Sequence, residues 1–454
     1  MTSVTDPTRP SAEERRREQR AWYFYDWANS AFATTVAGVL FGPYLIAVAE
    51  EAATGTPARV DVLGLAVAPG SLPAFTITVS TLLSAVLLPL LGAVADRTER
   101  KKDLLAGFAW AGALASLGLF FTTGDDWQLG AVSFIVANLC FGAAAVFNDA
   151  LLCLIADEDE RDRVSSRGWA FGYAGGGLLL ALNFVVVSFH DAFGLDQALA
   201  VRLSMLSATL WWAGFTLIPF LRLRHHPVVD LEPVEGGVVR RSFGQLAGTL
   251  KDIRHYPVTL TFLAAYLFFN DGIQTVIGQA AVYGEEELGF ETGTVLATYL
   301  LVQVVAVGGA LAFGRAAERY GAKPVVLAGL VVWSGIVTAA LFLPAGALVP
   351  FLLLGAAIGV VLGGTQALAR SWFSLLVPRG KEAEYFSFYH AMERGTSWLG
   401  TLVFGIVYQL TDSYRPAVFA LIVFFVVGGL LLTRVDTARG IADAQRGHPA
   451  AARG

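Results

Sequence analysis

A short polar pattern occurs twice in otherwise apolar sequence, once in each half of the chain. Each copy has an aspartate, an amide three residues later and a hydroxyl four residues later: Asp26, Asn29 and Ser30, then Asp271, Gln274 and Thr275. On a helix these three positions share one face. Because a carboxylate is costly to place in lipid, we expect each copy to face a partner or a polar path, where it can bind a proton or an amine.

The elements that carry these residues are predicted to be membrane-spanning helices. Of the 454 residues, 55% are hydrophobic and only 15% are charged, which is too little polar surface for a soluble globule of this size. A helix needs roughly 20 apolar residues to span the hydrocarbon core. Twelve such segments can be placed, at 22–48, 72–95, 103–122, 129–155, 167–189, 202–221, 256–282, 293–314, 323–343, 348–374, 384–409 and 414–433. The expected fold class is therefore an all-α integral membrane protein with twelve transmembrane helices.

The cations predict the orientation of these helices. If both termini are cytoplasmic, 28 of the 32 lysines and arginines fall on the inner side. Arg59, Arg202 and Arg415 fall outside, and Arg394 lies within a span. The outer loop 284–292 carries four glutamates and no cation. This asymmetry is the one that the positive-inside rule demands. We expect a multi-pass protein of the cell membrane with both termini in the cytoplasm.

The chain also reads as a duplication. Residues 92–107 and 314–329 share seven identities in sixteen positions at an offset of 222, and both join the second and third spans of a six-span half. We expect two pseudo-symmetric six-helix bundles. The predicted boundaries are an N-terminal tail at 1–21, a first bundle at 22–221, a charged linker at 222–255, a second bundle at 256–433 and a C-terminal tail at 434–454. Disorder is expected for residues 1–20 and 435–454.

The duplicated loop resembles a motif of the major facilitator superfamily. Its cytoplasmic loop signature, roughly Gly-x-x-x-Asp-Arg-x-x-Arg-Lys, is matched at Gly92, Asp96, Arg97, Arg100 and Lys101. The second copy has Gly314, Glu318 and Arg319. It has Gly321 and Ala322 where the first copy has Glu99 and Arg100, so it lacks two charges that a charge relay would use. In that superfamily the loop acts as a conformational latch that favours the outward-facing state. We expect Asp96 to meet the N-terminus of a second-half helix, where the helix dipole favours an anion.

Other motifs resemble one branch of that superfamily. They are WYFYDWANSAFATTV (22–36), FNDALL (147–152), SSRGWAFGYAGGG (165–177), FFNDGIQTV (268–276) and GGTQALARS (363–371). The branch contains vacuolar amino-acid effluxers linked to autophagy and bacterial permeases of unknown substrate. The resemblance extends from Trp22 to about Leu432 and implies the major facilitator fold and a transport function.

Polar residues inside the spans are the candidates for a substrate or proton path. Besides the two repeated patterns, they are Asn148, Asp149, Asn183, Asn270, Gln366, Arg370, His390, Glu393 and Arg394. Asp271 lies about fifteen residues into its span, roughly 20 Å from the inner end, and is the deepest carboxylate. It is predicted to bind substrate amine or a proton, with an interhelical hydrogen bond as the alternative. Replacing Asp271 with Asn is predicted to abolish transport or its pH dependence.

The remaining charged candidates are expected nearer the inner interface. Asp26 follows Arg20 by six residues, so a gating or packing role is favoured over substrate contact, and Asp149 is similar. His390 and Glu393 share a helix face, which permits a proton-relay pair, with an amphipathic helix end as the alternative. Arg394 is expected to meet Asp26, Asp149 or Asp271.

These observations favour a secondary active transporter for a small polar solute, with an amino acid as the leading candidate and proton coupling left open. No Walker-type Gly-Lys-Ser/Thr sequence is present, so ATP is not the direct energy source. The six histidines lack metal-ligand or catalytic spacing, so we expect no enzyme activity, no cofactor and no metal. The predicted partners are the solute, protons and the bilayer, without nucleic acid, and the chain is expected to be a monomer. A non-transporting membrane sensor and a lipid-handling protein remain as alternatives.

Overall fold

The computed structural model describes residues 11–55, 58–227, 256–395, 398–411 and 413–446. Most of the predicted linker at 222–255, and the ends of both predicted tails, lie outside these ranges. Eleven helical segments of the described chain are long and apolar enough to cross a membrane. The prediction of an all-α membrane fold is confirmed.

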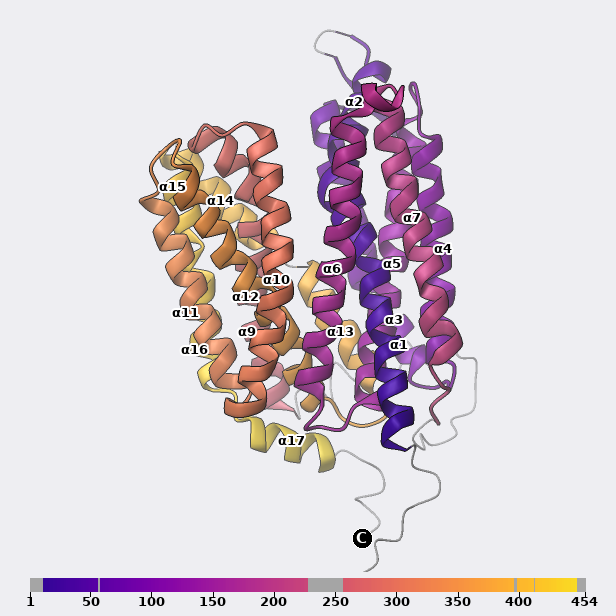
Figure 1. Ribbon diagram of the computed structural model, residues 1–454, viewed down its shortest axis with the longest axis vertical. Helices are drawn as coiled ribbons and strands as arrows, with labels where there is room; N and C mark the ends of the chain where they lie inside the picture. The colour runs from indigo at the N-terminus through magenta and orange to yellow at the C-terminus, as the bar shows by residue number, and fades with distance from the viewer. Residues whose placement is uncertain (1–10, 56–57, 228–255, 396–397, 412, 447–454) are drawn as a thin grey trace, which may run out of the picture.

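The first half of the chain forms one bundle (Figure 1). Its long helices run nearly parallel and antiparallel because each is apolar over most of its circumference and packs on its neighbours. A short hairpin with Val60 paired to Val67 joins the first two spans. The elements are α1 (Ala12–Ala31), η1 (Phe32–Leu40), α2 (Phe41–Ala52), β1 (Val60–Val62), β2 (Leu65–Val67), η2 (Pro69–Ser71), α3 (Leu72–Ala95), α4 (Lys101–Phe121), α5 (Trp127–Ile155), α6 (Arg161–Ser188), η3 (His190–Phe193) and α7 (Gln197–Arg222).

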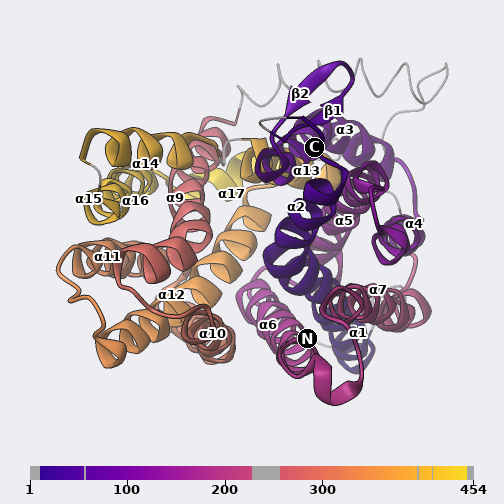
Figure 2. The ribbon, with the colours of Figure 1, turned by 90° about the horizontal axis from the view of Figure 1, so that it is seen from above.

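The second half forms a second bundle beside it (Figure 2). Its elements are α9 (Pro257–Val282), η5 (Tyr283–Glu287), α10 (Thr292–Tyr320), α11 (Ala322–Leu341), α12 (Leu348–Leu375), α13 (Glu382–Gly395), α14 (Trp398–Thr411), α15 (Tyr414–Ala420), α16 (Ile422–Thr433) and α17 (Thr437–Arg446). The predicted span 384–409 is occupied by two helices of 14 residues each, α13 and α14. Residues 396–397 between them lie outside the described part of the chain, so neither helix is among the eleven long segments, and the twelfth predicted span stays a prediction.

Two expectations for the tails are corrected. Residues 11–20 are not disordered, because α1 begins at Ala12 with a capping box in which the Ser11 hydroxyl accepts from the Glu14 N–H and the Glu14 carboxylate from the Ser11 N–H. This signature satisfies two of the free donors at a helix start and is readable in the sequence. Residues 437–446 likewise form α17, which packs so closely that a Cβ on Gly440 would lie 2.5 Å from Leu376.

The two bundles meet at one end of the molecule, which we call the terminal face because α1 begins there and α17 lies there (Figure 1). The opposite end carries the β1–β2 hairpin and is called the hairpin face. The contacts across the seam are reciprocal: α13 packs on α3 and α5, and α6 packs on α10 and α12. The same pairing occurs in both directions, as expected for duplicated halves.

Glycines permit the close approach at this seam. A Cβ at Gly92 in α3 would lie 2.4 Å from the carbonyl oxygen of Ala383, at the start of α13. A Cβ at Gly314 in α10 would lie 2.6 Å from Ser166 in α6. Backbones approach closely only where a side chain is absent. The first glycine of each duplicated loop motif therefore has a packing role at the seam.

Candidate functional site

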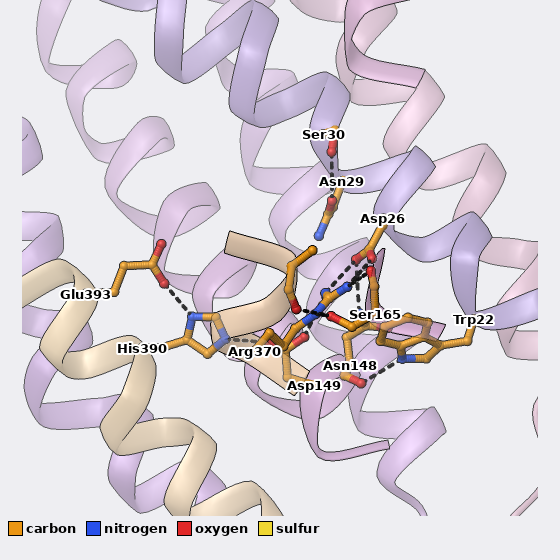
Figure 3. A network of polar contacts seen from close by, with 11 residues as sticks. Trp22, Asp26, Asn29, Ser30, Asn148, Asp149, Ser165, Arg370, His390 and Glu393 are labelled. Atoms are coloured by element: carbon orange, nitrogen blue, oxygen red, sulfur yellow. Dashed lines mark hydrogen bonds and ion pairs between the residues drawn. The ribbon is translucent and has the colours of Figure 1, made fainter. Parts of the chain in front are cut away.

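Five charged or ionisable side chains meet across the seam and form what we call the charged cluster: Asp26, Asp149, Arg370, His390 and Glu393 (Figure 3). Arg370, on α12, is its centre. Its Nη2 lies 3.1 Å from Asp26 Oδ2 on α1, and its Nη1 lies 3.1 Å from Asp149 Oδ1 on α5. One guanidinium from the second bundle thus binds two carboxylates from the first.

The histidine extends the cluster along α13. His390 Nε2 lies 3.0 Å from Asp149 Oδ2, and His390 Nδ1 lies 3.0 Å from Glu393 Oε2. The expected His390–Glu393 pair is therefore formed, and Asp149 links it to Arg370. With both ring nitrogens next to carboxylates, the imidazole can pass a proton between Asp149 and Glu393.

Neutral groups hold the ions in place. Ser165 on α6 accepts a hydrogen bond from Arg370 Nε at 2.9 Å, and its carbonyl accepts another from Nη2 at 3.0 Å. Asn148 Nδ2 donates to Asp26 Oδ1 at 3.1 Å, and Trp22 Nε1 donates to the Asn148 carbonyl at 2.7 Å. The guanidinium also lies over the Trp22 ring, 4.7 Å from its centre. All three nitrogens of the guanidinium therefore have partners.

Local sequence explains why α6 can pass beside these ions. Gly168 follows Ser165 by one turn, and a Cβ there would lie 2.4 Å from Asp26 Oδ2 and 2.9 Å from Arg370 Nη2. Any larger residue would displace the ion pair. In the sequence, Ser165 and Gly168 stand out only as members of the family motif at 165–177. Their contacts with Arg370 depend on which helices meet, which periodicity does not reveal.

Burial makes this cluster a strong interaction. Asp26, Asp149 and Arg370 are 7%, 4% and 4% exposed. Removing one member of a buried pair leaves an unpaired charge and costs about 3–5 kcal/mol. Asp26 and Asp149 lie in one bundle and Arg370 and His390 in the other, so the terminal face can separate only when these ion pairs break.

Two cavities lie between the bundles. The smaller, about 150 Å³, is lined by the whole charged cluster with Asn29, Ser30 and Asn148. The larger, about 490 Å³, lies between Ala37–Val39 of η1 and helices of the second bundle. Its lining is mostly aliphatic and aromatic, and Gln274 is one of its polar groups. The π-helical segment η1 interrupts the first span next to the Asp26 pattern, a feature frequent at functional sites.

Asp271 lies apart from both cavities. It is 1% exposed, and its Oδ2 accepts a hydrogen bond of 2.7 Å from the Gly400 N–H in α14. This is the interhelical bond considered as the alternative for this residue. Asp26 lines the small cavity and pairs with Arg370 across the seam, a position that suits the gating role favoured for it, and the ranking of the two aspartates as binding sites stays a prediction. The transport phenotype predicted for Asp271→Asn stays a prediction.

Most of the other predicted path residues pair locally. Gln366 Nε2 donates to Asn270 Oδ1 at 2.8 Å, joining α12 to α9. Asn183 joins α6 to α7 through Ser204 and Ser207. The side chain of Arg394 lies outside the described part of the chain, so its expected carboxylate partner is not assigned. Asp26 and Asp149, two of the three acids expected to meet Arg394, instead lie against Arg370.

The loop after α3 makes the contact that a latch requires. Asp96 Oδ1 accepts from the Ala383 N–H at 2.9 Å, and Oδ2 accepts from the Glu384 N–H at 2.8 Å. Both donors belong to the first turn of α13, where the helix dipole favours an anion. Lys101 Nζ lies 3.4 Å from Asp96 Oδ1. Burial and the nearby Glu382 raise the pKa of the Asp96 carboxyl, whereas Lys101 and the two N–H groups lower it and favour the anion.

The second loop copy is only half equivalent. Gly314 packs against α6 as Gly92 packs against α13. Glu318, however, is exposed, as is Arg319, which lies over the Tyr320 ring. The role of Arg97 and Arg100 in the first copy stays a prediction. The latch contact thus forms at Asp96 and not at its counterpart.

Replacing Asp96 with Asn is expected to weaken the closed terminal face. An amide offers one acceptor oxygen where the carboxylate offers two, so one α13 N–H loses its partner. A buried donor left unsatisfied costs about 1–3 kcal/mol. Double electron–electron resonance between spin labels on α3 and α12 measures the closed population. Glu318→Gln is the matched control, and equal populations in both variants would contradict the latch.

The comparisons with known proteins agree with this architecture. Residues 14–445 match the family described as Vacuole effluxer Atg22 like. The chain is 30% identical over 437 residues to an uncharacterized MFS-type transporter, YxiO, of Bacillus subtilis (strain 168), covering 95% of this chain and 98% of that protein. It is 24% identical over 576 residues to autophagy-related protein 22-1 of Neosartorya fischeri, covering 98% and 94%.

Solved structures share the fold at low sequence identity. The proton:xylose symporter XylE, bound to 6-bromo-6-deoxy-D-glucose, superposes with a TM-score of 0.70 at 12% identity, covering 94% of this chain and 97% of that chain. A bacterial homologue of the iron transporter ferroportin in an outward-facing state gives a TM-score of 0.66 at 14% identity, covering 93% and 99%. At these identities the likeness concerns the fold alone.

Proposed function

The chain belongs to the Atg22-like vacuole effluxer family of the major facilitator superfamily, and from that premise we propose that this membrane transporter carries an amino acid by alternating access. The observation that carries the proposal is the charged cluster. It joins the two bundles at the terminal face and lines a cavity at the seam. Rocking of two like halves around a fixed site requires such breakable contacts between them.

The chemistry of the cavity favours a zwitterion. Arg370 supplies a cation for a carboxylate, and Asp26, Asp149 and Glu393 supply anions for an ammonium group. A ligand that carries both charges can replace the ion pairs within the cluster by pairs with itself. The larger, mostly aliphatic cavity begins at Ala37, one turn along the first span from Ala33 of the small cavity, and is proposed to receive the side chain of the solute. Ligand binding would then loosen the seam by competing for the groups that close it.

The proposed orientation places the terminal face in the cytoplasm. The described cations after α3, α5, α7, α10 and α12 all lie at that face, as the positive-inside rule requires for the cytoplasmic side. With the terminal face closed, the structure corresponds to the outward-facing side of the cycle. His390, held between Asp149 and Glu393, is the proposed carrier of a coupled proton.

Counterflow in proteoliposomes tests the function. Liposomes loaded with an unlabelled amino acid mixture are expected to accumulate external radiolabelled amino acid transiently. In a separate assay, net uptake of amino acid into liposomes without internal solute is expected to change the internal pH, which an enclosed dye reports. Empty liposomes and liposomes loaded with xylose are the controls. Binding of amino acids without any exchange would contradict the transporter and favour a sensor. Net uptake without a change of internal pH would contradict the coupling alone.

A further inference from the structure

A basic cavity lies at the terminal face, away from the charged cluster. Its volume is about 590 Å³, and it lies between the first turns of α1 and the end of α7. Four arginines and two glutamates line it: Glu14, Arg17, Glu18, Arg20, Arg222 and Arg224. The proposed transport function makes no use of these residues.

Fixed contacts hold the walls of this cavity together. Glu18 is 2% exposed, and its Oε1 accepts a hydrogen bond of 2.9 Å from the Arg224 N–H. The same oxygen lies 2.9 Å from His226 Nε2. The Arg224 guanidinium donates to Glu14 at 2.6 Å. Both acids of the cavity are thereby occupied by groups of the segment that follows α7.

Arg20 and Arg222 supply the unbalanced positive charge. Both are exposed, and neither forms an ion pair within the residues that the structure describes. Arg17 is paired with Glu13 at the exposed side of α1. Two guanidinium groups that face one basic cavity offer several N–H donors in the planar geometry that suits a phosphate.

The position of the two arginines indicates which kind of phosphate compound binds, a lipid headgroup rather than a free phosphate. The apolar part of α1 begins directly after Arg20, and that of α7 ends directly before Arg222. The cavity therefore lies where hydrocarbon meets headgroups. Leu210, Leu217 and Leu221 are 58%, 47% and 66% exposed and follow one face of α7 up from this point. We propose that the cavity binds the headgroup of an anionic phospholipid, with an acyl chain along this face.

Lipid titration of the purified, full-length protein tests this site. Dioleoyl phosphatidylglycerol added to protein in phosphatidylcholine nanodiscs is expected to raise its melting temperature in a saturable way, because a ligand of the folded state stabilises it. In Arg20→Gln/Arg222→Gln the apparent affinity is expected to fall about tenfold or more. Arg315→Gln/Arg319→Gln removes two exposed arginines at the same face and is the matched control, expected to behave as wild type.

Each outcome decides the proposal. An equal melting temperature of wild type and variants in pure phosphatidylcholine establishes that the variants fold. If the double variant does not fold, the single variants Arg20→Gln and Arg222→Gln are titrated in its place. Equal affinity of the cavity variant and the control would overturn the site. Stabilisation by inorganic phosphate or glycerol 3-phosphate as strong as that by the lipid would overturn the assignment to a phospholipid.

Discussion

Replacing Arg370 with Ala is expected to abolish counterflow and to open the terminal face. The substitution leaves Asp26 and Asp149 buried without their cation, and an unpaired buried charge costs about 3–5 kcal/mol. The ratio of closed to open terminal faces should fall more than a hundredfold. The checks are amino acid counterflow and the distance distribution between spin labels on the two bundles.

Three further variants separate the ion pairs from simple loss of packing. Arg370→Lys keeps the charge but not the planar donors, so we expect a partial loss. The triple variant Asp26→Asn/Asp149→Asn/Arg370→Gln removes the three charges of the Arg370 ion pairs and is expected to close again without transporting. Arg379→Ala, at an exposed position of the same face, is the control. An Arg370→Ala protein that transports and closes like the control would contradict the role of the cluster.

Replacing Gly92 with Ala is expected to hold the terminal face open. The new Cβ would lie 2.4 Å from the Ala383 carbonyl oxygen and 2.9 Å from the Ser387 Cβ. Relief requires α3 and α13 to move apart, and overpacking of this kind costs about 1–3 kcal/mol. The closed population should therefore fall by about tenfold or more, with a parallel loss of counterflow.

Gly107→Ala is the matched control for this substitution. Gly107 also lies in a helix of the first bundle, but no atom lies within 4 Å of a Cβ placed there. We expect it to behave as wild type or to gain slight stability, because alanine favours helix over glycine. Equal closed populations in the two variants would mean that the α3–α13 contact does not control the terminal face.

The sequence predicts the architecture because the bilayer sets the length of apolar sequence that a spanning helix needs. The apolar segments predict the spans, and the repeated loop motif predicts that the chain has two similar halves. The same reasoning misses the helical start at Ala12, although the Ser11/Glu14 capping box is visible in the sequence.

The sequence does not predict which charged residues of the site pair with one another. Asp26, Asp149 and Arg370 are each recognisable as costly buried charges, so they can be named as candidates. Which acid meets which cation depends on the crossing of α1, α5 and α12 at the seam. Depth within a span ranks Asp271 above Asp26, yet Asp271 binds the Gly400 N–H while Asp26 lines the cavity with Arg370. Depth along a helix says nothing of the direction in which a side chain points.

Binding of an amino acid is expected to exchange a closed terminal face for a closed hairpin face. Double electron–electron resonance on two label pairs, in protein with Cys140 and Cys153 replaced by Ala, measures both faces. One pair joins Glu99 to Arg379 across the terminal face, and the other joins Asp125 to Glu291 across the hairpin face, all at exposed positions. We predict that amino acid lengthens the first distance and shortens the second in the same titration. Distances that stay fixed, or that change together in one direction, would contradict alternating access.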